Sequence, residues 1–178
     1  FDPSSLACSG TDIDMCLTPG QVESLQRAYS PTFTESGEFV YTGHAYGFEL
    51  GWRMPTPEAE PRTSPTASFR YLGHEDPNWN WQDFELATDL VLVMENAGHL
   101  EAADPDLGEF KARGGKLIMY HGWNDPGPSP LSTIQYYNQM LDAMGPDQDD
   151  WMRLYMMPGV GHCRGGAGPD QANFMSAM

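Results

Sequence analysis

The fold of this chain is decided by two segments, Lys116-Leu-Ile-Met-Tyr-His-Gly-Trp-Asn-Asp125 and Met152-Arg-Leu-Tyr-Met-Met-Pro-Gly-Val-Gly-His-Cys163. Each begins with a short apolar run, which is typical of a parallel strand buried on both faces. Each run leads directly into a turn, and the turns contain Asp125 and His162. The carboxyl ends of parallel strands open on one edge of a sheet, where such folds build their sites. We therefore expect Asp125 and His162 to be neighbours in space, although 37 residues (162 − 125) separate them.

The residues around these two runs predict helices. Between the runs, Ser129 caps a helix that has Pro130 at its first position, and Gly145-Pro146 ends it. Before the first run, Asp104-Pro105 starts a helix that Gly114-Gly115 ends in the left-handed conformation. Helices and strands that alternate at this spacing predict an α/β fold with a parallel sheet.

Asp125 and His162 are the candidate catalytic residues. A buried carboxylate holds an adjacent imidazole in one tautomer and stabilises its protonated form, as a general base for a Ser nucleophile requires. In α/β-hydrolases the acid and the His follow in this order after a Ser in a G-x-S-x-G elbow. The 178 residues contain no G-x-S-x-G sequence. The sequence thus offers an acid and a base without a nucleophile elbow.

Other interpretations of the same residues are weaker. Asp125 would cap the segment after its turn if it had no catalytic role, as Asx residues before Pro commonly do. Cys163 is a poor nucleophile for His162, because adjacent side chains in an extended loop diverge. A zinc site made of His121, His162 and Cys163 would need a fourth ligand, and none is evident. Ser129 suits a helix cap better than a strained elbow.

The two segments, together with Ser129-Pro-Leu-Ser-Thr-Ile-Gln-Tyr-Tyr137, resemble the tannase and feruloyl esterase family of α/β-hydrolases. That family includes the mono(hydroxyethyl) terephthalate hydrolases. The Gly161-His-Cys163 ending is the most specific part of the resemblance. A weaker match, Cys16-Leu-Thr-Pro-Gly-Gln-Val22 with Cys8 before it, resembles the lid domain of the family. The resemblance implies that Asp125 and His162 are the acid and the base of a Ser-His-Asp triad.

The resemblance also implies partners for Cys163. In the family, a Cys directly before the nucleophilic Ser is disulfide-bonded to the Cys directly after the catalytic His, which is Cys163 here. That Ser, its Cys and a calcium-binding acidic loop of the lid are expected upstream of where this chain begins. The chain would then need an upstream segment of the same enzyme that carries Cys-Ser and is linked to Cys163. We expect the isolated chain to be inactive and to hold no cofactor or metal, with a structural calcium in the upstream lid part.

The resemblance divides the chain into residues 1–85, the distal part of a lid domain, and residues 86–178, the C-terminal part of the catalytic domain. The run Thr18-Pro-Gly-Gln21 predicts a helix start with a capping box. From Thr32 to Ala67 the chain is rich in turns and scattered aromatic residues, which is typical of a lid built from loops and short strands. No substrate-contacting residue can be named from this region.

The composition excludes several classes of protein. The 25 acidic and 9 basic residues give a net charge of −16, and there are only two Lys. Nucleic-acid binding needs clustered Lys and Arg and is not expected. No apolar run reaches the 18 residues that indicate a membrane span. Cys8 and Cys16 are placed to form a small disulfide that leaves Cys163 single. Disulfides require an oxidising compartment, so we expect a secreted or periplasmic protein.

The expected function is hydrolysis of aromatic carboxylic esters, such as those of gallate or ferulate, through an acyl-enzyme on a Ser outside this chain. The alternative is a non-catalytic remnant that binds phenolic compounds or carbohydrates. The sequence does not separate tannase from feruloyl esterase or terephthalate monoester hydrolase. In this family the selectivity for the acyl group resides in lid side chains.

Overall fold

The computed structural model describes residues 1–10, 14–52 and 66–177. The chain divides into two compact units. The first consists of Phe1–Phe33, Phe39–Trp52 and Pro105–Met178, and the second of Thr34–Glu38 and Arg53–Asp104. This division does not decide where a lid domain would end, so the boundary between residues 85 and 86 stays a prediction.

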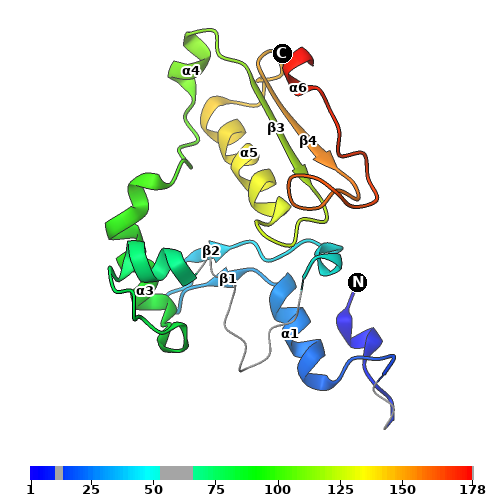
Figure 1. Cartoon of the computed structure of the whole chain (residues 1–178). Helices are drawn as coiled ribbons and strands as arrows, with labels where there is room; N and C mark the ends of the chain where they lie inside the picture. The colour runs from blue at the N-terminus through cyan, green and yellow to red at the C-terminus, as the bar shows by residue number, and fades with distance from the viewer. Residues whose placement is uncertain (11–13, 53–65, 178) are drawn as a thin grey trace. The chain divides into compact units, whose positions relative to one another are not determined.

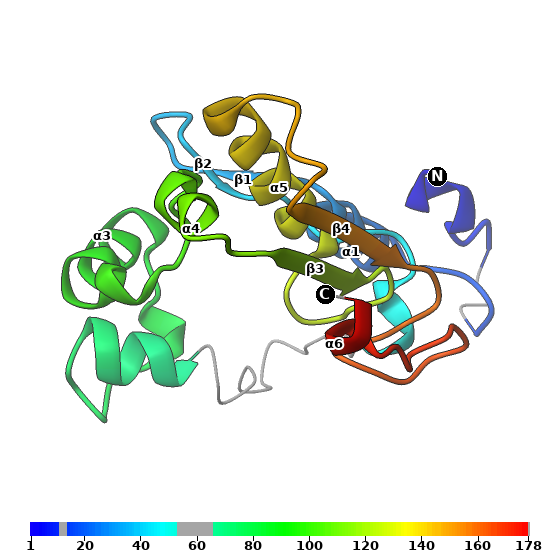
Figure 2. The same cartoon turned by 90° about the horizontal axis from the view of Figure 1, so that it is seen from above.

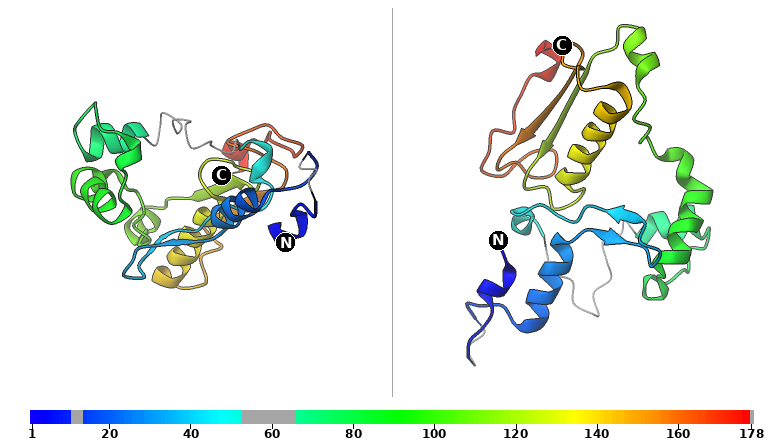
Figure 3. Two further views of the ribbon diagram at one scale, coloured as in Figure 1. Left: turned by 90° about the horizontal axis from the view of Figure 1, so that it is seen from below. Right: turned by 180° about the vertical axis from the view of Figure 1, so that it is seen from behind.

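The first unit contains a parallel pair of strands (Figure 1). Strand β3 (Leu117–Gly122) pairs with β4 (Met152–Met157) over all six residues of each, in a continuous register. Helix α5 (Pro130–Met144) connects the two strands and packs against both. The view from behind in Figure 3 shows the helix running along the strand pair. The order strand, helix, parallel strand is the predicted α/β arrangement.

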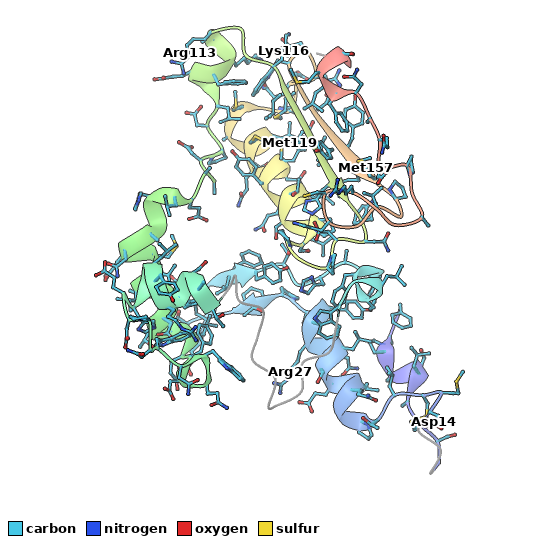
Figure 4. The ribbon with its side chains drawn as sticks, in the orientation of Figure 1. Asp14, Arg27, Arg113, Lys116, Met119 and Met157 are labelled. Carbon is cyan, nitrogen blue, oxygen red and sulfur yellow. A yellow bond between two sulfur atoms is a disulfide. The ribbon has the colours of Figure 1, made fainter. Side chains whose placement is uncertain are left out.

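Apolar side chains between α5 and the strands form the core of this unit. Met140 of α5 and Met152 of β4 are fully buried, and Trp151 is nearly so. Partly buried side chains pack around these three: Leu107, Leu117, Met119, Tyr136, Tyr137, Leu141 and Met144. Figure 4 labels Met119 on β3. Burial of an apolar side chain of this size stabilises a fold by about 1.5–3 kcal/mol, so this cluster holds both strands in place.

Helix α5 begins and ends as its sequence predicts. Pro130 occupies its first turn, and the Ser129 Oγ accepts a hydrogen bond from the Leu131 N–H at 3.2 Å. Gly145 follows the helix with a φ of 89°, which favours glycine. The prediction that Ser129 is a helix cap is confirmed.

Helix α4 (Gly108–Ala112) is shorter than predicted. It does not begin near Asp104, because the chain first makes a turn in which the Asp106 Oδ1 accepts the Gly108 N–H at 2.9 Å. Such side-chain hydrogen bonds compete with a helical start. Gly114 follows the helix with a φ of 80°, in the left-handed conformation predicted for its end.

The face of the strand pair opposite α5 is only partly covered. Tyr120 and Tyr155 are register partners on this face and are 47% and 49% exposed. Helix α6 (Phe174–Ala177) lies on this side, as Figure 2 shows, and its Phe174 ring stacks on Tyr120 at a centroid distance of 4.3 Å. The prediction that the strands are buried on both faces is wrong within the described residues, because a four-residue helix covers much less surface than α5.

Helix α1 (Pro19–Tyr29) forms part of the N-terminal half of the first unit. Thr18 and Gln21 form the predicted capping box, in which each accepts a hydrogen bond from the backbone N–H of the other. Val22 and Leu25 are the buried residues of this helix. The chain before α1 forms a short 3-10 helix, η1 (Pro3–Leu6).

A disulfide bond joins Cys8 to Cys16. It closes the loop that precedes α1, as the spacing of the two residues predicts. Closing a loop of this length lowers the entropy of the unfolded chain, which stabilises the folded state by about 2–3 kcal/mol. The bond therefore stabilises a segment that has little apolar core of its own.

After α1 the chain forms a hairpin and a compact aromatic turn. Strands β1 (Thr32–Phe33) and β2 (Phe39–Tyr41) pair antiparallel. The 3-10 helix η2 (Phe48–Leu50) follows. Its Phe48 is fully buried, and the ring stacks on His44 with a centroid distance of 4.4 Å and an interplanar angle of 7°. This ring pair fixes the course of the backbone between β2 and η2.

The described residues of the second unit are mainly helical. They form η3 (Ser68–Gly73), which is a π-helical turn, η4 (Trp81–Asp83), α3 (Leu86–Ala97) and η5 (Gly98–Leu100). His74 links them: its Nε2 lies 2.9 Å from the Oδ1 of the buried Asp89, and its ring stacks on Trp79. His74 therefore has a packing role in this unit. None of the helices in the described part of the chain has the length and apolar character needed to cross a membrane.

Candidate active site

The turns after β3 and β4 leave the same edge of the strand pair, as parallel strands require. Met157, labelled in Figure 4, marks this edge at the end of β4. Two backbone hydrogen bonds join the turns: the Trp123 N–H donates to the Met157 carbonyl, and the Asn124 N–H donates to the Val160 carbonyl, both at 3.0 Å. A Cβ on Gly122 would lie 2.6 Å from the Gly161 carbonyl oxygen, so only glycine allows this approach.

Asp125 and His162 meet at this edge. The Asp125 Oδ2 lies 2.9 Å from the His162 Nδ1. The Asp125 side chain is 4% exposed, whereas the His162 side chain is 59% exposed. An ionised carboxylate can only accept hydrogen bonds, so the His162 Nδ1 carries the proton and its Nε2 is left as an acceptor. The pair has the geometry of a general base oriented by a carboxylate.

His121 contacts the same carboxylate, which the sequence did not predict. Its Nε2 lies 3.1 Å from the Asp125 Oδ2, and its Nδ1 lies 2.7 Å from the Thr133 Oγ1 in α5. The second carboxylate oxygen, Oδ1, accepts the Gly127 N–H at 2.8 Å. The sequence signal was the spacing of His121 and Asp125, four residues apart across a turn.

A hollow of about 210 Å³ opens beside the pair. Its lining includes Tyr120 of β3, Val160, His162 and Cys163. Cys163 is exposed, forms no disulfide within the chain and has a φ of 61°, which is uncommon for a residue with a side chain. The hollow therefore places a free thiol next to the imidazole of His162.

No metal centre is formed by the described residues. They contain no group of three or more His, Cys, Asp or Glu side chains placed to hold a metal ion. The zinc alternative for His121, His162 and Cys163 therefore finds no support. The calcium expected from the family resemblance concerns residues outside this chain and stays a prediction.

Tyr41 and His44 are partly buried and lie close enough to Asp125 to feel its charge. Burial raises the pKa of Tyr41, and the nearby charge of Asp125 adds to this, while hydrogen bonds with Ser129 act against it. Burial lowers the pKa of His44, and the Asp125 charge opposes this shift. His44 is therefore largely neutral at pH 7 and adds no positive charge near Asp125.

Residues 39–52 are tied to the turn that carries Asp125. The Asn124 Nδ2 donates to the Gly47 carbonyl at 2.8 Å. The Thr42 hydroxyl lies 3.0 Å from the hydroxyl of Ser132 in α5. These two contacts join residues 39–52 to the turn and to the start of α5.

Gly47 is the point where a side chain would break this attachment. Its φ is 99°, and an added Cβ would overlap the Asn124 amide. We expect Gly47→Ala to lower the free energy of unfolding by about 2–4 kcal/mol, from backbone strain and the lost hydrogen bond. Chemical denaturation of the purified protein measures this loss.

Gly37→Ala is the matched control for that substitution. Gly37 has a φ of 85°, and nothing lies within 4 Å of an added Cβ. It therefore tests backbone strain alone, with an expected loss of about 1–2 kcal/mol. Equal losses for the two variants would show that the contact between Gly47 and Asn124 contributes nothing to stability.

The whole chain matches one protein family. The family model described as tannase and feruloyl esterase aligns with residues 1–178. The chain belongs to the tannase and feruloyl esterase family. The family resemblance noted from the sequence is therefore confirmed.

Relatives in the tannase and feruloyl esterase family are longer than this chain. Probable feruloyl esterase B-2 from Aspergillus flavus is 28% identical over 171 residues, covering 94% of this chain and 33% of the relative. Feruloyl esterase C from Talaromyces stipitatus is 30% identical over 178 residues, covering 95% of this chain and 33% of the relative. The chain thus spans about a third of the length of the curated relatives it matches.

Solved structures of the tannase and feruloyl esterase family share the fold. Feruloyl esterase B from Aspergillus oryzae superposes with a TM-score of 0.83 at 26% identity, covering 94% of this chain and 35% of that one. Tannin acyl hydrolase from Aspergillus niger gives a TM-score of 0.73 at 20% identity, covering 100% of this chain and 38% of that one, a likeness of fold alone. The predicted α/β fold class is confirmed.

Proposed function

We propose that this chain supplies the acid and the base of a serine carboxylic-ester hydrolase that acts on esters of phenolic acids. The observation that supports this most directly is the pair of Asp125 and His162, with the Nδ1 of His162 2.9 Å from the Asp125 Oδ2. The Nε2 of His162 is left as an acceptor at an exposed edge, where it can reach a hydroxyl of another segment.

In the proposed reaction His162 transfers one proton in each half of the cycle. Its Nε2 takes the proton of a Ser hydroxyl as the Ser oxygen attacks the ester carbonyl, and then gives that proton to the leaving alcohol. An acyl-enzyme remains on the Ser. Water attacks it in the same way, with His162 first accepting a proton and then returning it to the Ser. Asp125 stabilises the imidazolium at each stage.

The Ser would come from an upstream segment of the same enzyme. No G-x-S-x-G sequence occurs among the 178 residues, and Ser129, which is 1% exposed, caps α5. We further propose that Cys163 bonds to a Cys beside that Ser. The exposed thiol of Cys163 lines the hollow next to His162, so such a bond would tie nucleophile and base together. A structural calcium in the upstream lid part and a secreted or periplasmic location belong to the same proposal.

The substrate class follows from the family and the names of its members. The relatives described above are named feruloyl esterases, and one structural neighbour is named a tannin acyl hydrolase. Ferulate and gallate are both phenolic acids, and this shared chemistry is the class that we assign.

The experiment that tests the proposed function combines mass analysis with turnover. In the natural protein, non-reducing electrophoresis and intact mass should show Cys163 bonded to a Cys beside a Ser. The same sample should hydrolyse methyl ferulate or methyl gallate, and a terephthalate monoester completes the panel. The isolated 178-residue chain is the control and should match buffer. If the natural protein also matched buffer and Cys163 proved unbonded, the chain would instead be a non-catalytic remnant that binds phenolic compounds or carbohydrates.

A further inference from the structure

We propose that His121 is a positioning residue. In its neutral form, with the proton on Nε2, it holds the carboxylate of Asp125 in place. This inference rests on the proposed function. The Asp125 Oδ2 faces two imidazoles at once, the His162 Nδ1 at 2.9 Å and the His121 Nε2 at 3.1 Å. The proposed catalytic cycle uses only His162. His121 therefore has a separate role in the site.

The tautomer of His121 follows from its two contacts. The Asp125 carboxylate only accepts hydrogen bonds, so the His121 Nε2 must carry a proton. The His121 Nδ1 lies 2.7 Å from the Thr133 Oγ1, and a hydroxyl can donate to it. One proton on Nε2 and none on Nδ1 satisfies both contacts without a second charge in this buried place.

Burial assigns different roles to the two histidines. The His121 side chain is 14% exposed and has both ring nitrogens engaged, so it cannot accept a proton from a nucleophile. The His162 side chain is 59% exposed and has one nitrogen left. His121 thus acts through Asp125, and His162 acts on the substrate side.

The contact from His121 completes a two-point support of the Asp125 carboxylate. The Gly127 N–H holds Oδ1 at 2.8 Å, and His121 holds Oδ2. Because His162 is largely exposed, its ring orientation depends on where Oδ2 lies. Without the His121 donor, the carboxylate can rotate away from the Gly127 N–H and carry the His162 ring with it. A misplacement of about 1 Å in such a site costs about 10²-fold in rate.

The test compares two substitutions of His121 in the natural protein. His121→Leu removes the donor, and we expect kcat for methyl ferulate or methyl gallate to fall about 10²-fold with an unchanged KM. His121→Gln keeps an N–H near the place of Nε2, and it should restore most of this loss. His99→Leu, at an exposed histidine of the second unit, is the matched control and should leave kcat unchanged. Equal losses in the Leu and Gln variants would overturn the proposal.

A spectroscopic measurement on the unsubstituted protein tests the tautomer independently of activity. The ¹⁵N NMR signals of the His121 ring should show a protonated Nε2 and an unprotonated Nδ1 at pH 7. Thr133→Val should change the Nδ1 signal, because it removes the hydroxyl and keeps the side-chain shape. An unprotonated Nε2 or an imidazolium would overturn the assignment. If substitution of Asp125 or His162 left activity intact, the proposed function would fail. If His121→Leu left activity intact while substitution of Asp125 or His162 abolished it, the inference about His121 would fail and the proposed function would stand.

Discussion

His162→Ala should lower kcat by about 10⁶-fold, the loss found when the base of a Ser-His-Asp triad is removed. The His162 Nε2 is the atom that takes the Ser proton in the proposed mechanism. Alanine leaves the Ser hydroxyl without a base and leaves the leaving alcohol without an acid. KM should stay close to its unsubstituted value, because the exposed imidazole contributes little to ground-state binding. Steady-state hydrolysis of methyl ferulate by the natural protein and by the variant measures the change.

His99→Ala is the matched control for that substitution. His99 is an exposed histidine in the second unit, and the same change there should leave kcat unaltered. His99→Ala should unfold at the same temperature as the unsubstituted protein, and His162→Ala should remain folded at the assay temperature, since each replaces an exposed side chain. A His162→Ala variant that kept more than a tenth of its activity would remove His162 from the proposed mechanism.

Asp125→Asn should lower kcat by about 10⁴-fold while the fold is retained. An amide can present its NH₂ group to the His162 Nδ1. The imidazole then moves its proton to Nε2, where it can no longer accept one from a Ser. His121 adds to this effect, because its Nε2–H competes for the single acceptor oxygen of the amide. The loss is expected in kcat and not in KM, and hydrolysis of methyl gallate or methyl ferulate measures it.

A double substitution separates the roles of Asp125 and His162. Asp125→Asn combined with His162→Ala should be no slower than His162→Ala alone, because the carboxylate acts only through the imidazole. Asp142→Asn, at an exposed position of α5, is the neutral control. Additive losses in the double variant would mean that Asp125 contributes to turnover by a route other than His162.

The sequence was sufficient to predict that Asp125 and His162 meet. The reason is topological: two apolar runs with a helix between them form a parallel pair, and the turns after parallel strands share an edge. The limits of α5 were predictable for a local reason. Ser129, Pro130 and Gly145 act on the backbone within one helical turn of their own positions.

Other features depended on side-chain contacts that the residue patterns did not predict. The contact between His121 and Asp125 depends on how the turn after β3 packs against the turn after β4. A His four residues before an Asp is also common in sequences where the two side chains form no such contact. The predicted start of a helix at Asp104-Pro105 was wrong, because the Asp106 side chain holds the Gly108 N–H in a turn. The exposure of Tyr120 depends on which helix packs over it, and strand composition does not reveal this.

The attachment of residues 39–52 to the turn that carries Asp125 has a practical meaning for protein engineering. Grafting this stretch from a homologue, in order to change which acids are released, would also replace the residues that hold the turn carrying Asp125 in its conformation. Chimeras that exchange it without a matching Asn124 and Ser132 should therefore lose turnover on every ester alike. A selectivity screen would misread that loss as poor recognition of the substrate.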